Sequence, residues 1–310
     1  MTKVPSAVSW RDWVAGARVR TLPLAFTPVI LGSGSAWWRA DFDAVLAVLA
    51  LIVALSLQIG VNFANDYSDG IRGTDDHRVG PERLTASGRV APGLVLRAAV
   101  VSFALALIAG LVLLLAARFG VLAEQGFVAW LAEVWVVLAI GAIAVLAAWF
   151  YTGGSTPYGY SGWGELVVFV FFGPVATLGT AWAMVGFIPP EAAFAGAGAG
   201  FFASAVLLVN NIRDIEQDRV VGKKTLAVKL GLRGSQVFLL VLLALPYVMV
   251  GILSWGFFWV PFVYATALIT LWVLIQVFLA QRPEDLIKAL GTLGLNALAY
   301  ALVLGLALAW

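Results

Sequence analysis

Residues 44–61 form an apolar run that ends directly in a polar stretch, and this junction constrains the fold more than any other part of the chain. Gln58 is the only residue of the run that is neither apolar nor small. An apolar run of this length is typical of a helix that crosses a membrane. The polar stretch, residues 62–76, contains the amides Asn62 and Asn65 and the carboxylates Asp66, Asp69, Asp75 and Asp76. Acidic groups beside a membrane span are costly to desolvate, so the junction predicts a compensating cation.

The composition is that of a membrane protein. The 310 residues are 62% hydrophobic and 12% charged, whereas soluble domains average about 45–50% apolar and about 25% charged residues. The chain has no cysteine, which excludes disulfides, thiolate metal sites and cysteine nucleophiles. His77 is the single histidine, so a histidine-ligated zinc or haem centre is not expected.

Nine apolar stretches are long enough to cross a membrane, and they predict an all-α polytopic membrane protein. We expect the nine transmembrane helices to form a bundle around a central cavity, with polar cap loops at residues 66–91 and 214–235. The whole chain, residues 1–310, is expected to be one transmembrane domain. The predicted spans are 22–38, 44–66, 92–117, 128–150, 164–186, 191–213, 236–254, 257–280 and 286–309.

The lysines and arginines are distributed unevenly between the two sides of this bundle. If the N-terminus is cytoplasmic, Arg39 and Arg118 are the only cations on the opposite side, which leaves 17 of the 19 in the tail and the cytoplasmic loops. Positive charge accumulates on the cytoplasmic side of membrane proteins. The sequence therefore predicts a multi-pass protein of the plasma (inner) membrane whose N-terminus and polar loops face the cytoplasm.

A second polar cluster follows the sixth predicted span and matches the first. Asn210 and Asn211 end that span, and Asp214 and Asp218 follow. In both clusters the aspartates are three or four positions apart, so on a helix they share one face and repel each other. Oxygen ligands without histidine or cysteine favour Mg²⁺, which binds through one or two carboxylates together with substrate phosphates.

Basic residues are interleaved with these acids. They are Arg72, Arg78 and Arg83 in the first loop and Arg213, Lys223 and Lys224 in the second. Arginine can grip phosphate oxygens with two hydrogen bonds, and lysine acts as a compact charge. Acids and cations beside an apolar bundle favour a substrate with a diphosphate head and a hydrocarbon tail. The charged groups would stabilise the leaving diphosphate, and the bundle would keep water from an allylic carbocation.

The pattern Asn65-Asp66-x-x-Asp69, together with Asp214-x-x-x-Asp218, resembles the two aspartate-rich motifs of the UbiA superfamily of intramembrane prenyltransferases. The resemblance implies nine transmembrane helices, Mg²⁺ as cofactor and polyprenyl diphosphate as donor. It implies that the four aspartates are catalytic and bind the metal together with Asn65. It also implies that the diphosphate is bound by Arg72, Arg78, Lys223 and Lys224.

The sequence does not decide which residues fill some positions of the two motifs. The family's first motif has a third aspartate where this chain has Gly73, and either Asp75 or Asp76 could take that place. Asn62, Asn210 and Asn211 lie on the same helix ends and are further candidates.

Other local stretches resemble the superfamily members that prenylate 1,4-dihydroxy-2-naphthoate in menaquinone biosynthesis. These stretches lie at residues 18–24, 69–81, 151–165 and 210–214. By that resemblance, the polyprenyl chain joins the ring carbon that bears the carboxylate, carbon dioxide is lost, and demethylmenaquinone is formed. The partners would be polyprenyl diphosphate, the aromatic acceptor and membrane lipid, with no nucleic acid.

Two alternatives stay open. The acceptor could be another aromatic compound, such as 4-hydroxybenzoate or homogentisate. A cation-coupled membrane transporter is the alternative from a different class, although the acids lie at span ends on one side rather than in the middle of the membrane.

The loop at residues 151–165 contains no lysine or arginine and is rich in glycine, tyrosine and hydroxyl groups. Such a loop could close over a flat aromatic acceptor, or it could be an interfacial belt of tyrosines. Candidate acceptor contacts are Tyr151, Tyr160 and Glu165. Arg20 could bind the acceptor carboxylate. Glu165 could instead make a structural hydrogen bond, and Arg20 could instead anchor the first span.

Overall fold

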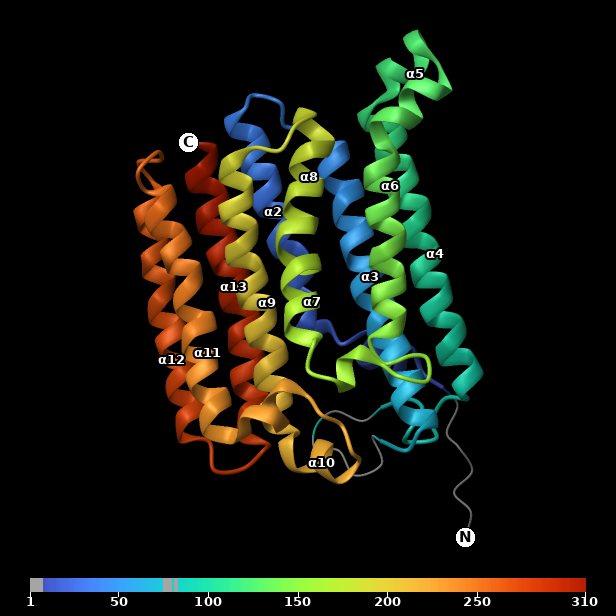
Figure 1. Ribbon diagram of the computed structural model, residues 1–310, viewed down its shortest axis with the longest axis vertical. Helices are drawn as coiled ribbons and strands as arrows, with labels where there is room; N and C mark the ends of the chain where they lie inside the picture. The colour runs from blue at the N-terminus through green and yellow to red at the C-terminus, as the bar shows by residue number, and fades with distance from the viewer. Residues whose placement is uncertain (1–7, 75–79, 81–82) are drawn as a thin grey trace.

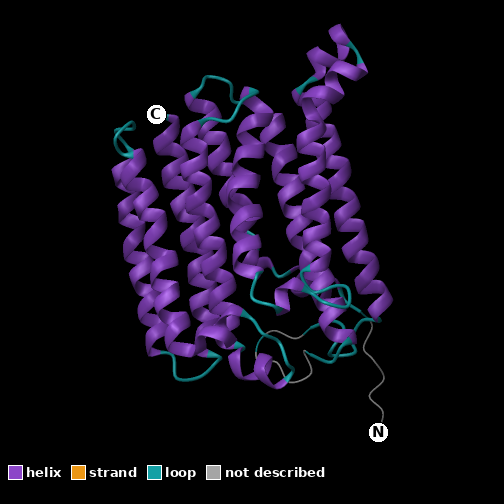
Figure 2. Ribbon diagram, in the orientation of Figure 1, coloured by secondary structure: helices purple, strands orange, loops and turns teal. Residues whose placement is uncertain are grey.

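The chain folds into an elongated helical bundle with most of its irregular loops gathered at one end (Figure 1). In the computed structural model, residues 8–74, 80 and 83–310 are described, and helices and loops account for all of them (Figure 2). We call the end that holds α10 and the loops after α3 and α6 the motif end, and the opposite end, which holds α5 and the C-terminus, the far end.

Long helices make up the bundle, and short ones decorate its two ends. The long elements are α2 (Pro23–Trp38), α3 (Ala44–Ile71), α4 (Pro92–Ala117), α6 (Phe127–Phe150), α9 (Pro190–Arg213), α11 (Leu226–Leu253), α12 (Ala267–Leu279) and α13 (Asp285–Ala309). A further long segment joins α7 (Gly164–Val170), the wider turn η3 (Phe171–Val175) and α8 (Ala176–Val185). The short helices are α1 (Trp10–Ala17), η1 (Val19–Thr21), α5 (Phe119–Gln125), η2 (Tyr158–Tyr160), α10 (Ile215–Val220) and η4 (Val260–Thr266).

The predicted spans correspond to these long segments. Among the described residues, 8 helical segments are long and apolar enough to cross a membrane, or 9 if the bent pair Trp10–Thr21 and Pro23–Trp38 counts as one span. The two parts of that pair meet at 51°. Pro23 is the first residue of α2, where its missing N–H costs no helical hydrogen bond.

Two helices extend further than their apolar stretches. Helix α3 continues past the predicted end at residue 66 to Ile71, and it carries the first aspartate cluster on helical backbone. Helix α11 begins at Leu226 instead of residue 236, where the side chain of Thr225 accepts a hydrogen bond from Val228 N at 3.4 Å. Hydropathy alone misses both ends because the extra turns carry charged residues. In α11 the added turns are also set apart by a break at Gly231, whose φ of 67° is not helical.

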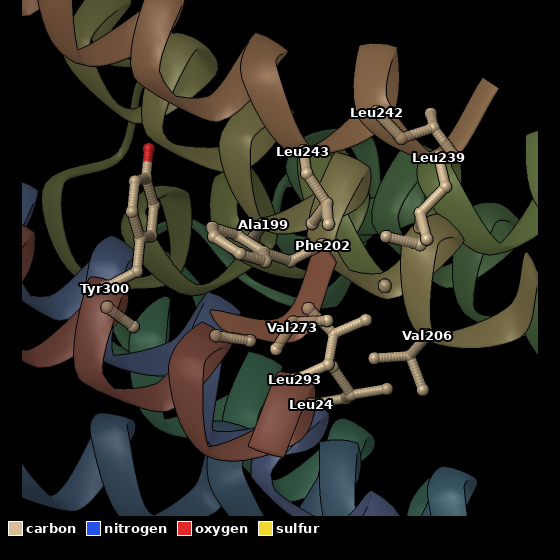
Figure 3. Packing of buried hydrophobic residues seen from close by; sticks show 14 of the residues in the cluster. Leu24, Ala199, Phe202, Val206, Leu239, Leu242, Leu243, Val273, Leu293 and Tyr300 are labelled. Carbon is tan, nitrogen blue, oxygen red and sulfur yellow. The ribbon is translucent and has the colours of Figure 1, made fainter. Parts of the chain in front are cut away.

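The hydrophobic core lies around α9, which is the most buried of the candidate spans. Its Phe202 packs against Tyr300 of α13, with ring centroids 5.0 Å apart, and near Leu243 of α11 (Figure 3). By contrast, Trp130 and Val134 are the only buried residues of α6. One side of the bundle is therefore tightly packed, and the other encloses open space.

Glycines allow several helices to approach closely. A Cβ atom on Gly34 of α2 would lie 2.4 Å from the carbonyl oxygen of Gly305 on α13. A Cβ atom on Gly173 of η3 would lie 2.5 Å from the Cα atom of Gly200 on α9. Small residues are a common means of packing helices in membranes, because they bring the backbones into van der Waals contact.

We expect Gly34→Ala to destabilise the protein by about 1–3 kcal/mol, because the added methyl group must push α2 and α13 apart. The thermal unfolding temperature of the purified protein measures this effect. Gly291→Ala on α13 is the matched control, since its Cβ atom meets nothing within 4 Å. Equal melting temperatures for the two variants would show that the contact at Gly34 is unimportant.

Candidate functional site

A cavity of about 1140 Å³ lies between the two sides of the bundle. Its wall is formed mainly by α2, α3, α4, α6, α9 and the segment α7–η3–α8, and it is apolar over most of its depth. At the motif end it is lined by Asn65, Asp66 and Asp69 of α3, by Asp214 directly after α9 and by Asp218 of α10. The two aspartate clusters therefore meet at the mouth of one cavity, as the sequence predicted.

Asp69 of the first cluster contacts both the loop after α6 and the second cluster. It is buried, and its Oδ1 atom accepts a hydrogen bond from the hydroxyl of Tyr160. The ammonium group of Lys223, which comes from the second cluster, lies 3.5 Å from the same oxygen. Asp69 thus already faces groups from two other segments of the chain.

Asp66 has a different environment, although it also lines the cavity. Its two carboxylate oxygens accept hydrogen bonds from the backbone N–H groups of Leu84 and Thr85, each at 2.9 Å. The carboxylate is 1% exposed. Asp66 therefore holds the turn at residues 83–85 against α3, which is a structural role that the sequence did not indicate.

We expect Asp66→Ala to destabilise the protein by about 2 kcal/mol or more, because it leaves two buried N–H groups without an acceptor. Thermal unfolding measured without substrate checks this expectation. An unchanged melting temperature combined with lost activity would instead favour a role of Asp66 at the reacting groups alone.

The second cluster is organised by Arg213. Its guanidinium group binds Asp214 through two hydrogen bonds of 2.6 and 2.7 Å and also donates to Asn210 Oδ1 at 2.8 Å. The N–H of Asp218 donates to the carbonyl of Asp214 at 2.8 Å, so one helical turn separates these aspartates. The predicted shared face is thus retained, although α9 ends at Arg213 and α10 begins at Ile215.

The loop between α6 and α7 bridges the two clusters. On the α3 side, Asn65 Oδ1 accepts a hydrogen bond from Thr152 Oγ1 at 2.8 Å, and Arg72 donates to the carbonyls of Thr152 and Gly154. On the other side, the N–H of Lys224 donates to the carbonyl of Tyr160 at 2.7 Å. Lys229 Nζ donates to the carbonyl of Ser161 at 2.6 Å. The loop therefore holds the two halves of the site together.

Tyr160 lies at the centre of this bridge. Lys223 Nζ lies 4.5 Å from the centroid of the Tyr160 ring. The guanidinium carbon of Arg72 lies 5.8 Å from the same centroid. Burial raises the pKa of Tyr160, and the negative charge of Asp69 raises it further. The hydroxyl consequently keeps its proton at physiological pH and donates to Asp69.

Tyr151 also lines the cavity, and burial raises the pKa of its hydroxyl well above the usual value. Arg20 lines the cavity mouth with an exposed side chain. These two residues and Tyr160 are therefore placed where an acceptor could contact them. Glu165 is buried outside the cavity lining, and its Oε1 atom accepts a hydrogen bond from Asn211 Nδ2 at 2.9 Å. The alternative of a structural hydrogen bond for Glu165 is the one that the geometry favours.

Several other predicted site residues contact other parts of the protein or lie at its surface. Arg72 and Lys224 do not line the cavity: Arg72 is used by the loop carbonyls, and the side chain of Lys224 is exposed. Their assignment to the diphosphate therefore gains no support from the cavity lining and stays a prediction. Asn62 Nδ2 donates to the carbonyl of Ala17 at 2.9 Å and connects α3 to α1. Asp75, Asp76 and Arg78 lie outside the described residues.

Three cavity-lining arginines were not assigned to the site from the sequence. Arg83 and Arg213 were noted only as flanking cations, yet both are buried at the cavity. Arg18 lies between α1 and η1 with a φ of 53°, which is unusual for a residue other than glycine, and it also lines the cavity. The interleaving of acids and bases was the signal for the first two, and the resemblance of residues 18–24 to known prenyltransferases was the signal for Arg18.

The donor set fits Mg²⁺ better than a transition metal. It consists of carboxylate and amide oxygens, which are hard ligands. No group of three or more acidic or histidine side chains is close enough to enclose a metal ion within residues 8–74, 80 and 83–310. Mg²⁺ typically binds through one or two protein carboxylates and completes its shell with substrate phosphates and water, so this arrangement suits a metal that is bound together with a diphosphate.

Comparisons with known proteins were made for the whole chain. Residues 25–299 match the model of the UbiA prenyltransferase family. A 1,4-dihydroxy-2-naphthoate octaprenyltransferase of Mycobacterium tuberculosis is 43% identical over 302 residues, which cover 97% of this chain and 98% of that protein. An enzyme of the same description from Escherichia coli is 39% identical over 220 residues, covering 71% of this chain and 68% of that protein.

Solved structures show the same fold. A UbiA homolog from Aeropyrum pernix K1 superposes with a TM-score of 0.66 at 18% identity, covering 93% of this chain and 97% of the other. A UbiA homolog from Archaeoglobus fulgidus bound to GPP and Mg²⁺ superposes with a TM-score of 0.65 at 14% identity, covering 94% and 99%.

Proposed function

The chain belongs to the UbiA prenyltransferase family, and from this premise we propose that it transfers a polyprenyl group from polyprenyl diphosphate to 1,4-dihydroxy-2-naphthoate. One observation carries the proposal beyond the family: both aspartate clusters and a set of cations meet at the mouth of a deep apolar cavity. This arrangement separates a place for a charged head from a place for a hydrocarbon tail. The 43% identical relative supports the choice of the naphthoate acceptor.

The diphosphate head is bound at the cavity mouth. Lys223, Arg18, Arg83 and Arg213 line the cavity there and supply positive charge, while Arg20 lies at its edge. Asn65, Asp66, Asp69, Asp214 and Asp218 would hold Mg²⁺, and Asp66 also keeps the adjacent turn in place. Bound Mg²⁺ would offset the negative charge that develops on the departing diphosphate.

The reaction is a substitution at the first carbon of the prenyl chain. The bond between that carbon and the diphosphate oxygen breaks, and its electron pair leaves with the diphosphate. The ring carbon that bears the carboxylate supplies the electron pair of the new carbon–carbon bond. The carboxylate then leaves as carbon dioxide, and its electron pair restores the aromatic ring, so the immediate product is the quinol form of demethylmenaquinone.

The chain's own residues position the two substrates and exclude water. Tyr151 and Tyr160 lie between the clusters, where their rings can contact a flat acceptor. Lys223 and the arginines hold the diphosphate and stabilise the charge that it acquires. The apolar cavity wall removes water from the allylic carbon as positive charge develops there.

A panel of donors and acceptors tests this function. The purified protein in lipid nanodiscs is incubated with Mg²⁺, one prenyl diphosphate and each acceptor in turn, and the products are identified by mass spectrometry. We expect the decarboxylated prenyl naphthoquinol from 1,4-dihydroxy-2-naphthoate, and at least tenfold less product from 4-hydroxybenzoate or homogentisate. The absence of any prenylated product from all acceptors would refute the proposal.

We further propose that the protein resides in the plasma membrane with the motif end facing the cytoplasm, as one transmembrane domain. The distribution of cations supports this orientation. Two arginines lie at the far end instead, and both are paired with acids. Arg39 binds Glu191 at 2.7 Å, and Arg118 lies 3.4 Å from Glu133. Pairing lowers the cost of leaving these arginines on the far side.

The absence of cysteine allows a direct test of orientation. Glu216→Cys on α10 and Gln125→Cys on α5 each introduce one exposed thiol, at opposite ends of the bundle. In intact cells, a membrane-impermeant maleimide should label position 125 and leave position 216 unlabelled until the membrane is opened. The reverse labelling pattern would show that the motif end is extracytoplasmic.

A further inference from the structure

The cavity continues from the aspartate clusters almost to the far end of the bundle. Along α3 its lining residues extend from Asp66 to Ala50. Asp69, one turn beyond Asp66, also lines the cavity, so the lining spans 19 residue steps of α3 and, at a rise of about 1.5 Å per residue, a depth of about 28 Å. The far end is lined by Trp182 and Ile188 on one side and by Glu133 on the other.

Trp182 is held in place by Arg118. The carbon of the Arg118 guanidinium lies 4.4 Å from the centroid of the Trp182 ring, and its Nη2 atom donates to the Trp182 carbonyl at 2.9 Å. Its Nη1 atom donates to the carbonyl of Ala117 at 2.7 Å, so the arginine connects the end of α4 to the end of α8. The nearby Glu133 compensates the charge.

A hydrophobic cluster supports this contact from behind. Leu114, Trp130 and Val134 are buried together, and Trp182 packs against them. The indole of Trp130 is 3% exposed, and its Nε1 atom donates to the carbonyl of Leu114 at 3.4 Å. Packed and hydrogen-bonded groups therefore hold Trp182 in place at the far end of the cavity.

We propose that Trp182, held by Arg118, is the floor of the tail-binding part of the cavity and limits the length of the prenyl chain that the enzyme prefers. The inference rests on the proposed prenyltransferase function. The diphosphate is fixed at the mouth, so a tail that reaches the floor buries its whole length. A longer tail must fold back or leave between the helices, and either outcome loses contacts with the cavity wall.

A larger side chain at Gly179 would shorten the tail-binding part of the cavity. Gly179 lies on α8 one turn before Trp182, it lines the cavity, and a Cβ atom on it would meet nothing within 4 Å. This sets it apart from Gly32, whose Cβ atom would collide with Thr177 O at 2.6 Å. A leucine at position 179 can therefore fill cavity space without displacing a helix.

The test is a competition between a short donor, geranyl diphosphate, and a long donor, octaprenyl diphosphate, with one acceptor. The ratio of kcat/KM for the long donor to that for the short donor is measured by mass spectrometry of the products. We expect Gly179→Leu to lower this ratio at least tenfold with little change for the short donor, since one methylene in an apolar pocket changes discrimination by roughly tenfold or more. Trp182→Ala should raise the ratio by a similar factor.

Trp272→Ala on α12 is the control, because that side chain is 55% exposed and lies outside the cavity lining. An unchanged ratio in Gly179→Leu would overturn the proposal and would show that the tail leaves the cavity by another route. Equal loss of activity toward both donors would also overturn it, because a purely structural role does not change the ratio. If Trp182→Ala fails to fold, Gly179→Leu decides the question alone. If the unmodified protein prenylates no acceptor with either donor, the proposed function itself is wrong.

Discussion

Asp69→Asn and Asp218→Asn should each lower kcat by at least about 100-fold, which is the scale seen when one group that stabilises developing charge is removed. Each change removes one negative charge from the cavity mouth and preserves the shape of the side chain. Both aspartates are buried at the cavity, and they come from opposite halves of the bundle. The rate of product formation is measured over a range of Mg²⁺ concentrations, and we expect high Mg²⁺ to restore little of the activity.

Glu216→Gln is the matched control for Asp218→Asn. Glu216 lies on the same short helix, its side chain is 85% exposed, and its ion pair with Arg219 is on the surface. We expect its activity and Mg²⁺ requirement to equal those of the unmodified protein. Near-normal activity of both aspartate variants at high Mg²⁺ would contradict the roles assigned to the two clusters.

Tyr160→Phe should raise the Mg²⁺ concentration needed for half-maximal activity by about 10–100-fold, the usual effect of removing a group that orients a metal ligand. The variant loses the hydroxyl that donates to Asp69, while the ring that faces Lys223 is retained. Because the pKa of Tyr160 is raised, the hydroxyl keeps its proton and donates a hydrogen bond to Asp69 throughout the physiological range. Activity is therefore titrated with Mg²⁺ at saturating acceptor, and the KM of the acceptor is measured separately.

Tyr158→Phe is the control for this change. Tyr158 lies two residues away in the same loop, and its hydroxyl donates to the carbonyl of Ala147 at 2.8 Å instead of to an acid. Its Mg²⁺ requirement should be unchanged. If Tyr160→Phe instead raised only the KM of the acceptor, Tyr160 would be an acceptor contact and would not position Asp69.

Much of the fold follows from local features of the sequence. Membrane spans require long apolar runs, and a polar group next to such a run has few favourable environments, so both can be recognised without knowing which helices touch. The shared faces of Asp66 with Asp69 and of Asp214 with Asp218 follow from helical periodicity. The placement of both clusters at one end follows from the number of spans between them.

The individual roles within the site depended on contacts between distant parts of the chain. Arg72 and Lys223 have the same charge and similar positions in the two polar loops, but Arg72 binds the carbonyls of Thr152 and Gly154, whereas Lys223 lines the cavity beside Asp69. Asp66 and Asp69 share a helix face, yet only Asp66 has both oxygens occupied by the turn at Leu84 and Thr85.

The sequence by itself thus determined the class of protein, the positions of the apolar spans, the two aspartate clusters and the end of the bundle at which they meet. Only the tertiary structure decided which side chains face the cavity, how the loop at Tyr160 connects the two halves, and that Trp182 lies at the far end of the cavity. The physical reason is the range of the interactions. Hydropathy and helical periodicity act between near neighbours in the chain, while a hydrogen bond such as that from Thr152 to Asn65 forms only after helices far apart in sequence have packed together.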